Sequence, residues 1–167
     1  MDPRRRILLL GLGNDIMGDD GVGLAAVRAL REEFSDDVDL VESGEAGLAL
    51  LDLLAGYDRV LLLDSVTTGD HSPGTVLEFG REDFDKVVGP SPHYAGLPEV
   101  LGLAERLGID FPGEIRVLAL EIDAPLEFRE ALSAEIERAL PAYVERAAAI
   151  LCEWHCARAQ GPASRSL

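Results

Sequence analysis

Three side chains that lie far apart in the sequence are suited to acid–base or metal chemistry: Asp20, Asp64 and His93. Asp64 ends an apolar run, residues 60–63, and burying a carboxylate there is costly unless it is paired or bound to a metal. Asp20 belongs to an acidic loop after a glycine turn, and carboxylates on a tight loop favour a cation. Two carboxylates and an imidazole together suit a divalent transition metal.

Each of these residues also has a plainer interpretation. Asp64 could accept a hydrogen bond from its neighbour Ser65. Either Asp19 or Asp20 could cap the following helix, because the positive end of a helix dipole favours an acid, and two adjacent acids leave one to spare. His93 lies between Pro92 and Tyr94 in a loop that two prolines make rigid, and it could be a surface histidine without a role.

A second group of possible ligands, Cys152, His155 and Cys156, lies near the C-terminus at helical spacing. Two or three ligands on one exposed helix do not close a tetrahedral site, so we expect packing or adventitious roles here. A disulfide between the two cysteines is not expected in a reducing compartment. His71, in a turn of small and polar residues, is expected to have no chemical role.

The glycine-rich stretch at residues 11–23 invites a nucleotide-binding interpretation, which the residues disfavour. The dinucleotide fingerprint G-x-G-x-x-G would place its third glycine at Ile16. The acids Asp15, Asp19 and Asp20 would repel a pyrophosphate. The chain also lacks the G-x-S-x-G motif of serine hydrolases and the H-E-x-x-H motif of zinc proteases.

Strand and helix patterns alternate along the chain, which favours a mostly parallel sheet with helices on both faces. We expect strands at 5–10, 37–42, 59–66, 74–79 and 114–121, with the alternating pattern of the fourth suited to a sheet edge, and helices at 22–34, 48–54, 97–107 and 127–159. Pro141 should kink or interrupt the last helix. One domain is expected over residues 1–160, followed by a flexible tail at 161–167.

The charge and the apolar content of the chain restrict the kinds of partner that it can bind. The net charge is −16 over 167 residues, which disfavours nucleic acid and anionic membrane surfaces, although solubility alone would also explain it. No segment approaches the roughly 18 apolar residues of a membrane span, and the N-terminal apolar run is too short for a signal peptide. We therefore expect a cytoplasmic protein.

Taken together, these motifs resemble the hydrogenase maturation endopeptidase family. The resemblance rests on GLGNDIMGDDGVG at 11–23, on SGEAG at 43–47 followed by RVLLLD at 59–64, and on SPHYAGL at 91–97. It covers roughly the first 105 residues. The C-terminal third departs further, because residues 121–125 stand where relatives carry a glutamate–proline segment.

The resemblance implies a three-layer α/β fold, with a twisted, mostly parallel five-stranded sheet sandwiched between helices. Family members remove a short C-terminal peptide from the large-subunit precursor of nickel-containing hydrogenases after nickel insertion, and they are often monomeric. The residues implied in nickel recognition and catalysis are Asp20, Asp64 and His93. The first-loop ligand is often glutamate in the family, so Asp19 remains an alternative to Asp20. The nickel would arrive with the substrate, and other divalent metals could substitute for it.

The leading hypothesis is therefore that the protein is an endopeptidase that recognises nickel bound to its substrate. The metal could polarise the scissile carbonyl or generate hydroxide, or it could only position the peptide while a carboxylate activates water. The competing hypothesis is a non-enzymatic nickel-sensing chaperone or docking factor that uses the same residues and releases the precursor uncut. Which hydrogenase is the substrate is left open.

Overall fold

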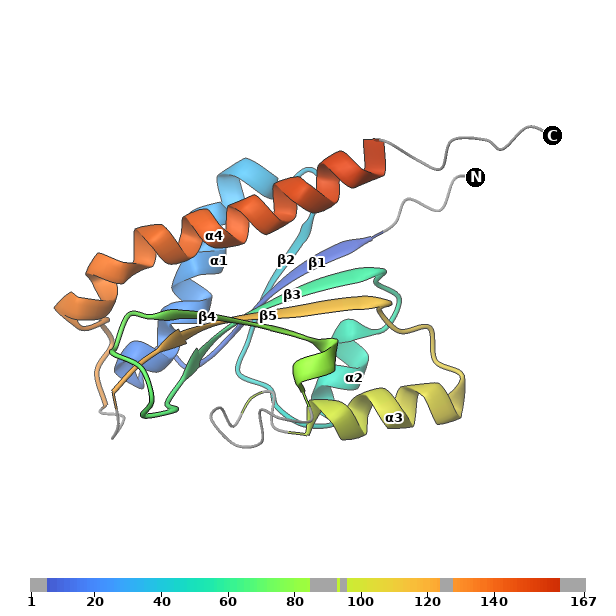
Figure 1. The fold of residues 1–167 in the computed structure, drawn as a ribbon, viewed down its shortest axis with the longest axis horizontal. Helices are drawn as coiled ribbons and strands as arrows, with labels where there is room; N and C mark the ends of the chain where they lie inside the picture. Colours follow the sequence, from blue (N-terminus) through green and yellow to red (C-terminus); the bar gives the residue numbers. More distant parts are fainter. Residues whose placement is uncertain (1–5, 85–92, 94–95, 124–127, 160–167) are drawn as a thin grey trace.

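The computed structural model describes residues 6–84, 93, 96–123 and 128–159, with the side chains of 157–159 left aside. A five-stranded sheet in the order β2-β1-β3-β5-β4 runs through its centre (Figure 1). The strands are β1 Ile7–Leu12, β2 Asp39–Ser43, β3 Arg59–Val66, β4 Val76–Gly80 and β5 Glu114–Glu121. Strand β4 pairs antiparallel with β5 at one edge, and the other pairs are parallel.

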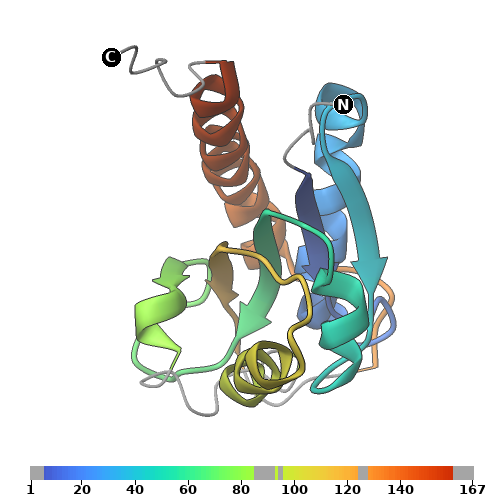
Figure 2. The ribbon, with the colours of Figure 1, turned by 90° about the vertical axis from the view of Figure 1, so that its right-hand side faces the viewer.

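Helices cover both faces of this sheet, as Figure 2 shows. Helices α1 (Val22–Phe34) and α4 (Ala134–Ala159) lie on one face, and α2 (Ala49–Leu54) and α3 (Leu97–Leu107) lie on the other. Short 3₁₀ turns form η1 (Gly18–Gly21) and η2 (Arg81–Asp83). The three-layer α/β fold expected from the sequence is thereby confirmed.

The core is divided in two by the sheet, because successive side chains of a strand point to opposite faces. Leu9 and Leu61 pack against the α1 and α4 side. Leu8 and Leu62 pack against the α2 and α3 side. Burial on both faces explains why the central strands are almost continuously apolar in sequence.

The largest departure from the predicted elements is at the start of α4, which begins at Ala134 and not near residue 127. The preceding residues are held in a non-helical path, since Met17 and Arg129 form a parallel β-bridge. Ser133 then starts the helix, with its hydroxyl accepting a hydrogen bond from the backbone N–H of Ile136 at 3.3 Å.

Pro141 was expected to kink or interrupt α4, and it does not interrupt the helix. The helix runs without a break through this position. Pro141 and Glu137, one turn earlier, both lie on the exposed side of the helix. Water can therefore hydrogen-bond the carbonyl that proline leaves without a helical donor, which reduces the cost of the substitution.

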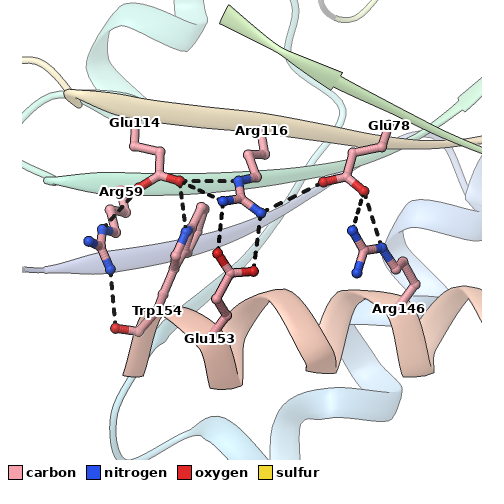
Figure 3. A network of polar contacts seen from close by, with 7 residues as sticks. All are labelled: Arg59, Glu78, Glu114, Arg116, Arg146, Glu153 and Trp154. Carbon is pink, nitrogen blue, oxygen red and sulfur yellow. Dashed lines mark hydrogen bonds and ion pairs between the residues drawn. The ribbon is translucent and has the colours of Figure 1, made fainter. Parts of the chain in front are cut away.

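A polar network attaches the C-terminal half of α4 to the sheet (Figure 3). Its members are Arg59, Glu78, Glu114, Arg116, Arg146, Glu153 and Trp154. The indole N–H of Trp154 donates to Glu114 Oε1 at 2.9 Å, and Arg116 pairs with Glu153 at 3.1 Å. Since Glu114 starts β5, the network fixes α4 near the amino end of that strand and leaves the carboxyl edge of the sheet for other contacts.

None of the helices within the described ranges combines the length and apolar character needed to cross a bilayer. The predicted tail at 161–167 and the loop immediately before His93 lie outside the described residues.

Candidate metal centre

Asp20, Asp64 and His93 converge at the carboxyl edge of the sheet. Each offers one ligand atom, and these atoms lie within 4.8 Å of one another. Their exposed fractions are 5%, 0% and 8%, respectively. Asp20 follows β1 and Asp64 lies near the end of β3, and these strands are neighbours in the sheet and parallel. The topology therefore brings together residues that are 44 and 29 positions apart (64 − 20 and 93 − 64).

Glycines allow the loop that carries Asp20 to pack closely against the strands. A Cβ atom at Gly23 would overlap the carbonyl oxygens of Leu12 and Leu63, so helix α1 can begin this close to the sheet only with glycine there. Gly13 has φ +145°, and a side chain on it would collide with the backbone of Asp20. These constraints fix the path of the loop and the position of Asp20.

The Asp20 carboxylate is oriented by a neighbouring strand. Its Oδ1 accepts a hydrogen bond from the Ser65 hydroxyl at 2.9 Å. Its other oxygen, Oδ2, lies 4.0 Å from His93 Nε2. One carboxylate oxygen is thus held by β3 while the other faces the imidazole.

Asp64 is the most deeply buried member of the cluster. Its Oδ1 accepts the backbone N–H of Ser65 at 2.8 Å and lies 3.2 Å from His93 Nδ1. Its backbone carbonyl accepts a hydrogen bond from the Tyr143 hydroxyl of α4 at 3.1 Å. Both the side chain and the main chain at this position are therefore fixed.

The two carboxylates raise the pKa of His93 above its ordinary value of 6.5. The main cause is the side-chain hydrogen bond with Asp64; burial acts in the opposite direction, and the charges of Asp64 and Asp20 add to the increase. Two buried carboxylates this close together favour a positive charge between them. Either a proton on His93 or a bound cation meets that requirement.

The donor set fits a divalent transition metal. Carboxylate oxygen and imidazole nitrogen are ligands that such ions share, and burial limits competition from water. Three protein donors would leave further coordination positions for groups from a substrate. Neutral imidazole is the form that binds metal, so an ion would displace the proton that the carboxylates otherwise favour on His93.

Asp19 points away from this cluster. Its carboxylate accepts the backbone N–H of Ser133 at 2.6 Å and pairs with Arg129 at 3.4 Å. The N-cap of α1 is Gly21, without a side-chain capping bond, so the expectation that Asp19 or Asp20 caps this helix is wrong. Asp19 instead ties the first loop to the segment that enters α4.

The other acidic, cysteine and histidine side chains singled out in the sequence do not join the cluster. Asp15 lies in the same loop but forms a bidentate pair with Arg28. Cys152, His155 and Cys156 are exposed on α4, and their donor atoms form no metal-sized group among the residues that the structure describes.

Sequence reasoning missed two residues that organise the site, Ser65 and Tyr143. Ser65 was considered only as a partner of Asp64, although it also holds Asp20. A polar residue inside the apolar strand RVLLLDSV was the available signal. Tyr143 carried no signal, because an apolar helix position occupied by tyrosine is ordinary.

The fold is thus an α/β sheet with a buried Asp–Asp–His cluster at the carboxyl ends of its strands, a group of side chains that could hold a metal ion. A family model described as hydrogenase maturation protease matches residues 24–150. The chain is similar to the hydrogenase expression/formation protein HupD of Rhizobium leguminosarum bv. viciae, with 31% identity over 91% of this chain and 77% of that protein. It is also similar to the hydrogenase 2 maturation protease of Escherichia coli strain K12, with 30% identity over 89% of this chain and 92% of that protein.

Solved structures agree with these sequence matches. The hydrogenase maturating endopeptidase HybD from E. coli superimposes with a TM-score of 0.77 at 30% identity, covering 89% of this chain and 93% of that one. The [NiFe] hydrogenase maturation protease HybD from Thermococcus kodakarensis gives 0.67 at 28% identity, covering 87% and 98%. The chain therefore belongs to the hydrogenase maturation protease family and is a peptidase.

Proposed function

We propose that this protein removes a C-terminal peptide from the nickel-loaded large-subunit precursor of a [NiFe] hydrogenase. Family membership supports the peptidase activity, and the T. kodakarensis relative is named as a [NiFe] hydrogenase maturation protease. The observation that carries the proposal is the buried convergence of Asp20, Asp64 and His93. Action in the cytoplasm and as a monomer belongs to the same proposal.

In this proposal nickel is part of the substrate, because the precursor brings it to the site. Asp20, Asp64 and His93 supply two oxygens and one nitrogen, and the precursor supplies the remaining ligands. Bound nickel would act as a Lewis acid toward a carbonyl or water nearby. A precursor without nickel would lack the cation that the two buried carboxylates favour, and it would therefore bind poorly.

The chain's own residues have separable tasks. Ser65 and the backbone N–H at the same position hold one oxygen of each aspartate in place. The His93 imidazole lies between both carboxylates and must lose its proton before it can bind a metal. A carboxylate that the metal does not use fully can accept a proton from an attacking water.

Mass spectrometry of the precursor tests this function directly. Purified protein is mixed with nickel-loaded and with nickel-free large subunit, and the mass of each is followed over time. We expect the nickel-loaded form to lose a C-terminal fragment and the nickel-free form to stay intact. Binding of the nickel-loaded precursor without any loss of mass would instead identify a docking factor.

A further inference from the structure

The large apolar side chains that the structure leaves exposed are unevenly distributed. Within the described ranges they are Ile16, Leu48, Leu107 and Phe128, with exposed fractions of 50%, 65%, 62% and 84%. The first two and the last follow the carboxyl ends of β1, β2 and β5, the edge that carries the metal centre. Leu107 ends α3, which leads to the opposite edge (Figure 1).

Ile16 and Phe128 lie on two backbone segments that pair with each other. The N–H of Arg129 donates to the carbonyl of Ile16 at 3.0 Å, and the N–H of Gly18 donates to the carbonyl of Arg129 at 2.7 Å. Met17 and Arg129 form the parallel bridge between them. The paired backbone therefore brings the positions of Ile16 and Phe128 opposite each other, one residue before the bridge; we call Ile16 and Phe128 the apolar pair.

Single exposed apolar residues are ordinary and need no partner. The apolar pair differs because Ile16 belongs to the loop that supplies Asp20, four residues later (20 − 16), and Phe128 belongs to the segment bridged to that loop. A polypeptide that brings a metal ion to Asp20 must approach this edge of the sheet. Apolar surface at that edge would then be removed from water when the polypeptide binds.

Charged residues close to Phe128 in the sequence also restrict the chemistry of the partner. Asp123 and Glu130, close to Phe128 in sequence, are exposed and form no ion pair within the part of the chain described. The whole chain has a net charge of −16. A complementary surface would combine an apolar side chain with lysine or arginine.

We propose that the apolar pair is a docking surface for the nickel-loaded precursor. The precursor places an apolar side chain against Ile16 and Phe128 and basic groups near Asp123 and Glu130. This inference rests on the proposed function and assigns to the same site a surface that selects the substrate. In this proposal Asp20, Asp64 and His93 bind the ion, and the apolar pair contacts the polypeptide around it.

The test compares Ile16→Ser/Phe128→Ser with the matched control Leu107→Ser, which removes an equally exposed apolar side chain from the opposite edge. Precursor shortening gives KM and kcat, and calorimetry gives the affinity of the free protein for Ni²⁺. We expect the double variant to raise KM by about tenfold or more, with kcat and metal affinity unchanged. Leu107→Ser should behave like the wild type. Increasing salt should raise the wild-type KM.

An unchanged KM in the double variant, or an equal rise in Leu107→Ser, would overturn the docking surface while leaving the peptidase function intact. A KM that does not change with salt would show that basic groups of the precursor do not bind near Asp123 and Glu130. If the wild-type protein binds the precursor without cutting it, the proposed function fails. In that case the affinities of the wild type, the double variant and Leu107→Ser for the precursor are compared at equilibrium. A weaker affinity of the double variant alone would support the docking surface, and equal affinities would overturn it.

Discussion

The hydroxyl of Ser65 donates a hydrogen bond to Oδ1 of Asp20 at 2.9 Å, and both side chains are buried. Ser65 lies on β3 directly after Asp64, so one strand carries one possible ligand and orients another. The bond crosses from β3 to the loop after β1. It leaves Oδ2 of Asp20 turned toward His93.

Replacing Ser65 by alanine should therefore weaken metal binding without removing a ligand. Loss of a residue that orients a ligand commonly lowers metal affinity about 10- to 100-fold, and we expect Ser65→Ala to fall in that range for Ni²⁺. Ser65→Thr keeps the hydroxyl and should recover most of the affinity. Calorimetric titration of the three proteins checks this; equal affinities would mean that the bond does not position Asp20.

Mutations of the adjacent acids Asp19 and Asp20 should affect different properties of the protein. Asp20→Asn should reduce Ni²⁺ affinity more than about tenfold, because a charged oxygen donor is lost from the cluster. Asp19→Asn should leave the affinity near wild type. It should instead lower the free energy of unfolding by about 1–3 kcal/mol, since Asp19 holds Ser133 and Arg129. The reverse pattern would make Asp19 the first-loop ligand.

The pKa of His93 should be above 6.5 in the metal-free protein, and Asp64→Asn should lower it, because Asp64 is the main cause of the increase. NMR titration of the imidazole protons measures both values, with the His93 signals assigned by their loss in His93→Gln. Metal and proton compete for the imidazole, so Ni²⁺ affinity should fall as the pH drops below this pKa. A pKa below 6.5 in the wild type would contradict the arrangement described.

The same shift has a consequence for stability. A histidine whose pKa is raised by folding stabilises the protein fully below its unfolded pKa of about 6.5, and that contribution disappears as the pH rises through the folded pKa. The difference in free energy of unfolding between the wild type and His93→Gln should therefore narrow with increasing pH. Urea denaturation at several pH values measures this difference. A difference that widens with increasing pH would contradict a raised pKa of His93 in the folded protein.

Tyr143 should matter for stability more than for metal binding. Its hydroxyl lies 2.7 Å from the carbonyl oxygen of Leu118 and 3.1 Å from that of Asp64, and it joins α4 to β5 and β3 in the core. Tyr143→Phe should lower the free energy of unfolding by about 1–3 kcal/mol because buried carbonyl groups lose a donor. A loss of Ni²⁺ affinity as large as that of Ser65→Ala would instead make the Asp64 main chain critical to the site.

Local patterns in the sequence predicted much of this fold. Helices α1 and α3 and strands β3 and β5 have the bounds that periodicity predicts, because each is a long segment with a consistent apolar pattern. The edge position of β4 was also expected and is confirmed. The three-residue cluster followed from chemistry at strand ends combined with a family resemblance, and the structure brings those residues together.

The parts that the sequence could not predict depend on contacts between distant segments. The start of α4 is set by the bridge between Met17 and Arg129, and nothing near Arg129 signals it. The different directions of the Asp19 and Asp20 carboxylates follow from their partners Ser133 and Ser65, more than 40 residues away in each case (133 − 19 and 65 − 20). Adjacent identical residues look equivalent until their long-range partners are known.

The most direct test of the central claim is the rate at which variants of the buried cluster shorten nickel-loaded precursor. Asp64→Ala and His93→Ala are compared by mass spectrometry with the wild type and with Leu107→Ser, which leaves the site untouched. Both cluster variants should process the precursor about 100-fold more slowly or not at all, while Leu107→Ser keeps the wild-type rate. Processing by Asp64→Ala and His93→Ala at the wild-type rate would show that the reaction takes place elsewhere on the protein.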